Sequence, residues 1–169
     1  MLPKPGSRAH QLVEQLGLSP HPERGFFVET YRAADVVVSS TRRGQRAAST
    51  AIYFLITREQ PCTHLHRLVS DEVFHLYEGG PLEVLCLFPD GAWKVARLGL
   101  ALDAGERPQL VIPAGTWFGT ELARTATHCL IGCTVAPGFE LADFELASGS
   151  ELEARYPDAA VRIRRMQGP

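Results

Sequence analysis

Short runs of apolar and aromatic residues, separated by turn sequences, dominate the chain from Phe26 onward. β-Branched and aromatic residues favour strands, and a period of two places one face of each strand against a core. The runs expected to form strands are FFVETYRA, STAIYFLIT, EVFHLYE, LEVLCLF, WKVARL, QLVIP and HCLIGCTV. Turn sequences lie between them, namely RRGQ, EGGP, PDGA, AGT and APG. Successive strands with no helix between them predict an antiparallel sandwich or barrel.

Helical periodicity is confined to the two ends of the chain. Ser7 is expected to cap a short amphipathic helix that carries Leu12 and Leu16 on one face and stops at Gly17. The sequence SPHPERG that follows is expected to be a loop, because a proline favours an extended residue before it.

The C-terminal end predicts a second helix. Ser150 and Glu153 have the spacing of a capping box, and Pro157 is expected to stop the helix. We expect one domain over residues 1–169, with an N-terminal helix at about 7–17, a β-barrel at about 25–147 and a C-terminal extension at about 148–169.

Composition excludes several classes of partner. The chain is 45% apolar and 21% charged, as in ordinary soluble domains, and its formal net charge of −2 offers no field for polyanions. Two short arginine clusters are expected to be solvated surface: Arg42, Arg43 and Arg46, and Arg162, Arg164 and Arg165. No apolar run reaches about 18 residues, and the first residues lack a signal-peptide core. We therefore expect no nucleic-acid partner, no membrane association and a cytoplasmic location.

The four cysteines are expected to be buried free thiols, as in a reducing compartment. Cys129 and Cys133 share a face of one expected strand but lie about 13 Å apart there, too far for a disulfide. The other two are Cys62 and Cys86.

The stretch CTHLHRLVSDEVFHLYEGG carries the densest chemistry in the chain. Residues two apart in a strand point the same way, so His64 and His66 are expected to face one side together. Ser70 and Asp71 favour a turn, and a hairpin there would bring Glu72 opposite the two histidines. Two imidazoles and a carboxylate are a metal-ligand set, and they are also a metal-free acid–base set.

Four further side chains are candidates for the same pocket. Glu29 and Tyr31 alternate along one strand, which suits either recognition of a polar ligand or plain solvation. Tyr53 is either a core residue or a proton donor beside the histidines. Trp117 either stacks on a ring-shaped ligand or caps the core.

Two other histidines are treated separately. His75 has the opposite strand parity from Glu72 and is expected to face away from the pocket. The role of His128 is left unassigned.

The histidine-rich stretch resembles the first motif of the cupins, G-x5-H-x-H-x(3,4)-E-x6-G. His64, His66, Glu72 and Gly79 stand at the matching places, with a gap between His66 and Glu72 one residue longer than usual.

The second cupin motif, G-x5-P-x-G-x2-H-x3-N, is only partly matched. Pro113 and Gly115 correspond to it, but its histidine place is occupied by Phe118 and its asparagine place by Leu122. In cupins that keep this histidine, it supplies a fourth metal ligand.

A narrower resemblance covers about Leu16 to Leu146. The chain is similar to the DUF985, or cupin-5, family in the ordered blocks LGLSPHPERGFFVETYR, STAIYFLI, HRLVSDEVFHLYEG, PLEVLCLFPDG, VIPAGTWF and CTVAPGFELADFEL. The resemblance implies a small cupin barrel that is usually a homodimer, and epimerase-like chemistry on sugar nucleotides has been suggested by fold analogy. The family usually has glycine where Arg24 stands, so Arg24 either alters the pocket mouth or points into solvent.

We therefore predict an all-β fold, a double-stranded β-helix with terminal helices, that assembles as a homodimer through RGFFVETYR. The first functional hypothesis is binding of a small polar metabolite, with isomerase or epimerase chemistry on a sugar or sugar derivative. His66 is the candidate base, Glu72 its partner and Tyr53 the acid. The candidate ligand contacts are His64, Glu29, Tyr31 and Trp117.

Two alternatives stay open. One is a metal-dependent cupin, an oxygenase or lyase, with His64, His66 and Glu72 as ligands; the other is a binding module without catalysis. No cofactor is required under the first hypothesis. Because Phe118 replaces a ligand, we expect a site that is metal-free or holds a divalent metal weakly.

Overall fold

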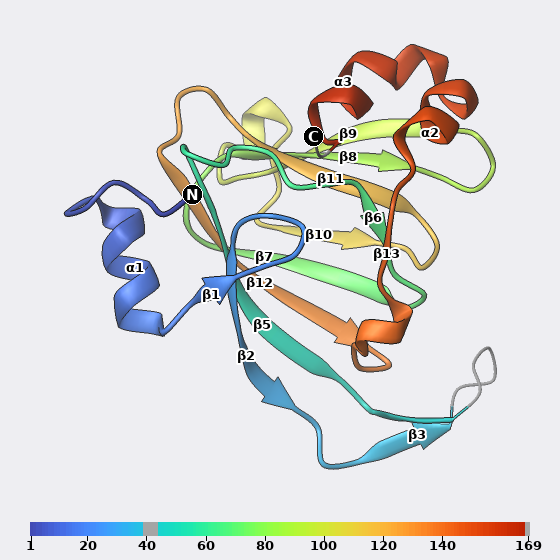
Figure 1. Ribbon diagram of the computed structural model, residues 1–169, viewed down its shortest axis with the longest axis horizontal. Helices are drawn as coiled ribbons and strands as arrows, with labels where there is room; N and C mark the ends of the chain where they lie inside the picture. Colours follow the sequence, from blue (N-terminus) through green and yellow to red (C-terminus); the bar gives the residue numbers. More distant parts are fainter. Residues whose placement is uncertain (39–43, 168–169) are drawn as a thin grey trace.

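Two antiparallel sheets face each other in the computed structural model, which describes residues 1–38 and 44–167 (Figure 1). In spatial order, the first sheet contains β1 (Ser19–Pro20), β2 (Phe26–Arg32), β5 (Thr50–Thr57), β12 (His128–Ala136), β7 (Asp71–Gly79) and β10 (Gln109–Ile112). The second contains β13 (Glu145–Leu146), β6 (His66–Arg67), β11 (Trp117–Leu122), β8 (Leu82–Leu87) and β9 (Trp93–Leu98). The predicted double-stranded β-helix of the cupin type is confirmed.

A separate hairpin and several short helices complete the described chain. The hairpin joins β3 (Val36–Val38) and β4 (Gln45–Ala47), and it extends away from the two main sheets in Figure 1. The predicted turn RRGQ includes Arg42 and Arg43, which lie outside the described residues. The helices are α1 (Arg8–Leu16), α2 (Gly149–Arg155) and α3 (Ala160–Arg165), with 3₁₀ turns at Leu102–Ala104, Leu141–Asp143 and Pro157–Ala159.

The N-terminal helix has the predicted ends. The Ser7 hydroxyl accepts a hydrogen bond from the His10 amide at 3.2 Å, and Gly17 adopts a left-handed conformation with φ of 64°. Leu12 is buried against Phe26 and its neighbours on the outer face of the first sheet. This apolar contact holds α1 on the barrel.

The C-terminal helix starts earlier than predicted. The N-cap of α2 is Ser148, and Ser150 lies inside the first turn, so the expected capping box does not form. Pro157 follows the end of α2 as expected, because a proline cannot continue the helical hydrogen bonding. The two C-terminal helices cover the outer face of the second sheet, where Tyr156 and Ile163 are buried.

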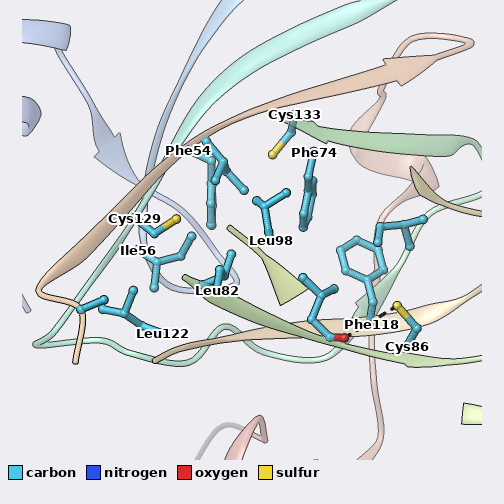
Figure 2. Packing of buried hydrophobic residues seen from close by; sticks show 14 residues of the cluster. Phe54, Ile56, Phe74, Leu82, Cys86, Leu98, Phe118, Leu122, Cys129 and Cys133 are labelled. Atoms are coloured by element: carbon cyan, nitrogen blue, oxygen red, sulfur yellow. Dashed lines mark hydrogen bonds between the residues drawn. The ribbon is translucent and has the colours of Figure 1, made fainter. Parts of the chain in front are cut away.

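The main core fills the space between the sheets. Figure 2 shows Phe54, Phe74 and Phe118 directed toward this space together with Leu98. Burial of each large apolar side chain stabilises the fold by roughly 1.5–3 kcal/mol. The next residue after Phe54, Leu55, is fully buried on the opposite face under α1. Strand β5 therefore reads as a nearly continuous apolar run because both of its faces are covered.

All four cysteines are free and buried, as predicted. None of the helices in the described ranges is long and apolar enough to cross a membrane.

Candidate functional site

A pocket of about 300 Å³ opens between the two sheets. Its walls are largely apolar, and six phenylalanines contribute to them: Phe27, Phe54, Phe74, Phe118, Phe139 and Phe144. Three buried side chains, Glu23, His66 and Glu72, form what we call the inner polar group. Three partly exposed side chains, Glu29, Arg32 and Glu140, form what we call the mouth.

His66 is held by a carboxylate from the N-terminal loop. Its Nδ1 lies 2.8 Å from Oε2 of Glu23 and 3.0 Å from the carbonyl oxygen of His64. Burial lowers the pKa of His66, but the attraction and hydrogen bond of Glu23, with a smaller effect of Glu72, outweigh burial and raise the pKa above 6.5. Within residues 1–38 and 44–167, Nε2 has no hydrogen-bond partner. The imidazole is fixed at one nitrogen and available at the other.

Glu72 is a buried acid with an unused oxygen. The residue is 7% exposed, and its Oε2 has no hydrogen-bond partner among the described residues. Burial raises the pKa of Glu72 to about 7, while the charge of His66 and a hydrogen bond from the Cys133 thiol act in the opposite direction. A carboxyl group that titrates near neutral pH can serve as either an acid or a base.

His21 supports Glu23 from the same loop. The backbone amide of Glu23 donates to Nδ1 of His21 at 3.3 Å, so His21 carries its proton on Nε2. The ring also packs edge-on against Phe27 and Phe54, at centroid distances of 4.6 and 5.5 Å. Burial lowers the pKa of His21, which keeps the ring neutral.

Sequence reasoning missed Glu23 and His21, because SPHPERG was interpreted only as a loop. The sequence feature that could have pointed to them is Arg24, which follows Glu23 at a position where the family usually has glycine. Arg24 and Gly25 have φ of 77° and 76°, a conformation that glycine adopts readily and other residues seldom do. This turn directs Glu23 into the barrel. Arg24 itself lines a separate surface groove, so it does not shape the pocket mouth.

The predicted hairpin between the histidines and Glu72 is wrong. Strand β6 pairs with β11 and β13 in the second sheet, whereas β7 pairs with β10 and β12 in the first. The chain therefore crosses from one sheet to the other near Ser70, whose hydroxyl donates to the carbonyl of Pro137 at 2.7 Å. His66 and Glu72 reach the same pocket from opposite sheets.

His64 does not join them. It precedes β6 in a non-strand segment, so strand alternation does not align it with His66. Its side chain lines another pocket, next to Leu65 and Met166, and its Nε2 has no partner among the described residues. His64 therefore lies outside the pocket that contains His66 and Glu72.

The donors do not fit a metal centre of the cupin type. The ring of Phe118, at the histidine place of the second motif, lies 4.1 Å from the His66 ring and is 1% exposed. His66 already uses Nδ1 for Glu23, and His64 is directed elsewhere. In the described ranges no three His, Cys, Asp or Glu side chains are grouped so that they could hold an ion. The predicted triad His64, His66 and Glu72 is not assembled.

Glu29 and Tyr31 lie on different faces of β2. Glu29 pairs with Ile52, and Tyr31 pairs with Ala51, so Thr30 is the extra residue of a β-bulge. Glu29 lines the pocket as predicted, while Tyr31 is 55% exposed and lies outside it. The bulge reverses the alternation on which the pairing of these residues was based.

Tyr53 and Trp117 also lie outside the pocket. Tyr53 follows Ile52, a pocket residue, and therefore faces the opposite side of the sheet, where it packs under α1. Trp117 precedes the pocket residue Phe118 and is buried under the C-terminal helices, with the Arg67 guanidinium 4.5 Å from its ring. Both are core residues, and neither can reach a ligand in the pocket.

Two further histidines, His75 and His128, have structural partners. His75 faces away from the pocket, as predicted, and contacts Gln109 at 3.1 Å. His128 lies 3.1 Å from a Glu78 oxygen, and Arg8 of α1 binds the same carboxylate at 2.7 Å. His128 thus helps to anchor the N-terminal helix.

Comparison with known proteins supports the family that the sequence resembles. The family model described as "Cupin superfamily (DUF985)" matches residues 10–147. An uncharacterized protein from Saccharomyces cerevisiae is 28% identical over 162 residues, which are 89% of this chain and 80% of that protein.

Two solved structures resemble this chain over 96% of its length. A hypothetical protein from Leishmania major has 32% identity and a TM-score of 0.89, with 100% of that chain covered. A protein from Shewanella oneidensis, solved by X-ray crystallography, has 35% identity and a TM-score of 0.86, with 99% of that chain covered. The chain belongs to the DUF985 family of the cupin superfamily.

Proposed function

We propose that the pocket binds a small organic molecule and transfers a proton on it, by chemistry of the isomerase or epimerase kind. The observation that supports this most directly is the meeting of His66 and Glu72 in one pocket from opposite sheets. Both side chains are buried. Burial raises the pKa of Glu72 to about 7, and the charge and hydrogen bond of Glu23 raise the pKa of His66. Groups tuned in this way are suited to general acid–base catalysis.

Glu23 acts in this proposal as a positioning residue. By binding Nδ1 of His66, it fixes the ring orientation and stabilises the imidazolium form. The same division of roles, in which a carboxylate orients a histidine that transfers the proton, recurs in unrelated enzymes. His21 in turn fixes the backbone of Glu23.

The proton transfer needs one proton shared between His66 and Glu72. The group without it removes a proton from a carbon next to a carbonyl, and the electron pair of the C–H bond forms an enolate. The protonated group gives its proton to the carbonyl oxygen. In an isomerisation, the abstracted proton returns to the former carbonyl carbon, and the hydroxyl of the neighbouring carbon gives its proton back to the group that protonated the oxygen as the new carbonyl forms. In an epimerisation, the protonated group instead delivers its proton to the other face of the same carbon, and the enolate returns to the carbonyl. Because the two titrations are coupled, either group can begin as the base.

Other expected participants have no part in this proposal. Tyr53 faces α1, so the acid is one of the two residues of the pair itself. The donors do not fit a metal, and no step is assigned to one. A sugar or sugar derivative as the substrate stays a prediction.

Hydrogen exchange from heavy water tests the proposal without a known substrate. The protein is incubated in D₂O with a pool of small carbonyl compounds, and deuterium at carbons next to the carbonyl is measured by mass spectrometry. We expect incorporation into one compound with the native protein and with His75→Gln, whose histidine lies on the outer face. We expect none with His66→Gln or Glu72→Gln, because each lacks one member of the pair.

The same experiment separates an enzyme from a binding module. A compound that binds the pocket but gains no deuterium, with a hydrogen available next to its carbonyl, would contradict proton transfer and favour binding without catalysis. Equal incorporation in native protein and His66→Gln would show that the pair is not the catalyst.

A further inference from the structure

The pocket lining is rich in carboxylates. The inner polar group contributes Glu23 and Glu72, and the mouth contributes Glu29 and Glu140. The permanently charged cation among the lining residues is Arg32. A pocket of this composition repels a phosphate or carboxylate group, because like charges cost more in a low-dielectric site than in water.

Most of the donors of Arg32 are already engaged by pocket residues. Its Nε and one terminal nitrogen bind the two oxygens of Glu29 at 2.9 and 2.8 Å, and the other terminal nitrogen binds Glu140 at 3.0 Å. It also donates to the carbonyl of Phe139 at 3.3 Å. An anionic ligand would have to displace these carboxylates before it could use the guanidinium.

Glu72, in contrast, favours a ligand group that donates a hydrogen bond or carries a positive charge. The residue is more than nine-tenths buried, lines the pocket, and leaves Oε2 without a partner among the described residues. A buried polar atom without a partner costs free energy, so a ligand donor that reaches it gains more than it would at an exposed site. The atom can accept a hydrogen bond from an N–H group, and it attracts a positive charge when ionised.

The walls select for an apolar ring. Phe54, Phe74 and Phe118 line the pocket from three strands, and Figure 2 shows them directed toward one space. Phe139 and Phe144 contribute from the segment that follows β12. Aromatic side chains pack well against planar rings and against cations. A volume of about 300 Å³ suits a molecule of one or two rings.

We propose that the ligand is a ring-bearing molecule with a protonated nitrogen, whose ring packs against the phenylalanines and whose N–H group binds Oε2 of Glu72. The inference deepens the proposed function and rests on its use of the same pocket. It directs the search away from phosphorylated sugars and sugar nucleotides, whose charges the lining carboxylates would repel.

Three matched probe molecules test the proposed class of ligand. Phenethylamine, 2-phenylethanol and 3-phenylpropanoate share a ring and a two-carbon chain and differ in the charge of the head group. Dissociation constants are measured by NMR titration at about pH 8, above the pKa of Glu72 of about 7. We expect the amine to bind about 10- to 100-fold more tightly than the alcohol, the range of a charge-assisted hydrogen bond. We expect the carboxylate to bind more weakly than the alcohol.

One substitution tests whether Glu72 causes the preference for the amine. Glu72→Gln keeps the shape but removes the charge, so affinity for the amine is expected to fall about 10-fold or more while affinity for the alcohol is unchanged. Glu151→Gln, at an exposed position on α2, is the matched control and should leave all three constants unchanged. The proposal is overturned if the carboxylate binds as tightly as the amine, if none of the probes binds, or if Glu72→Gln does not weaken the amine.

Failure of this inference can be distinguished from failure of the proposed function. The probes need no turnover, so binding of the amine by a protein that catalyses no deuterium exchange would keep the ligand class and remove the catalysis. Exchange into an anionic compound, with the amine unbound, would keep the catalysis and remove the ligand class.

Discussion

Oε2 of Glu23 lies 2.8 Å from Nδ1 of His66, and the two side chains are 10% and 5% exposed. The pair joins the N-terminal loop to the short strand β6 inside the barrel. At this depth little solvent screens the attraction, so Glu23 has a direct effect on the proton affinity of His66.

Substitution Glu23→Gln should lower the pKa of His66. The lost carboxylate is the main group that offsets burial of the ring, and burial favours the neutral imidazole. NMR titration of the histidine ring protons measures the change. Glu145→Gln is the control, since Glu145 pairs with the exposed side chain of the neighbouring Arg67. An unchanged or raised pKa in Glu23→Gln would contradict the assignment.

The same pair predicts a pH dependence of stability. His66 has a raised pKa in the folded protein, so its contribution is fully present below 6.5 and is lost as pH rises through the folded pKa. The difference in unfolding free energy between native protein and Glu23→Gln should therefore be larger at about pH 5 than at about pH 9. Urea unfolding at the two pH values measures it, and a difference that grows with pH would count against the ion pair.

Glu72→Gln should stabilise the folded protein at alkaline pH. Folding raises the pKa of Glu72 from 4.5 to about 7, so the folded state holds a proton that the unfolded chain has lost, and stability falls as pH rises through this window. The neutral glutamine removes this penalty, which corresponds to about 3 kcal/mol above pH 7. Chemical unfolding at about pH 5 and pH 8 should show the gain mainly at the higher pH.

Glu151→Gln, exposed on α2, serves as the control for this measurement and should show the same stability difference from native protein at both pH values. If Glu72→Gln is less stable than native protein at pH 8, a partner must stabilise the ionised carboxylate.

Metal content of the purified protein should be well below one ion per chain. The donors expected to bind an ion do not converge, because His64 lines another pocket and Phe118 fills the place of a fourth ligand. Elemental analysis of untagged protein prepared without chelator measures the content. Stoichiometric metal that is lost in His66→Ala but kept in His64→Ala would show that a cupin-like centre forms with other ligands.

The chain is expected to form a homodimer through β2 and the β3–β4 hairpin. β1 pairs with β2 only at Phe26 and Phe27, so much of one β2 edge lacks a partner among the described strands. A two-stranded hairpin is marginal in water, and Val36 and Val38 on it are 57% and 79% exposed. A second copy of the chain could pair with the open β2 edge and bury these valines.

Sedimentation at micromolar concentration measures the association. Native protein should be a dimer, and the double substitution Val36→Lys and Val38→Lys should shift it to monomer. Val161→Lys, at a position 63% exposed on α3, is the control and should remain dimeric. A native monomer at this concentration would contradict the prediction.

The family was identified from the resemblance of its ordered sequence blocks. Local alternation and turn residues predicted an antiparallel sandwich or barrel and its longer strands, with the exception of β11, which carries Phe118. The same alternation correctly placed His75 and Glu72 on opposite faces. It could not place Tyr53, since β5 is covered on both faces and the pattern does not tell which face meets the pocket. The bulge at Thr30 likewise has no local signal, and it separated Tyr31 from Glu29.

The inner polar group was less accessible to sequence reasoning. His66 and Glu72 were candidates because they stand in a recognisable motif, but their relation depends on a crossing between sheets that resembles a hairpin turn in sequence. Glu23 meets His66 through a contact between segments far apart in the sequence, in which the His64 amide also donates to the Glu23 carbonyl at 2.8 Å, and no local pattern reports such a contact. Its loop could be recognised as a turn, but not as a wall of the pocket.

The pocket is completed by segments from both ends of the barrel sequence. His21 and Glu23 precede the first long strand, and Phe139 and Phe144 follow the last one. During synthesis, a nascent chain that has not reached Phe144 therefore has most of its strands but an unfinished binding site. Ligand capture thus becomes a property of the finished chain, and by mass action a bound ligand opposes release of either end from the barrel. Occupancy and resistance to trimming by proteases are consequently linked in this fold.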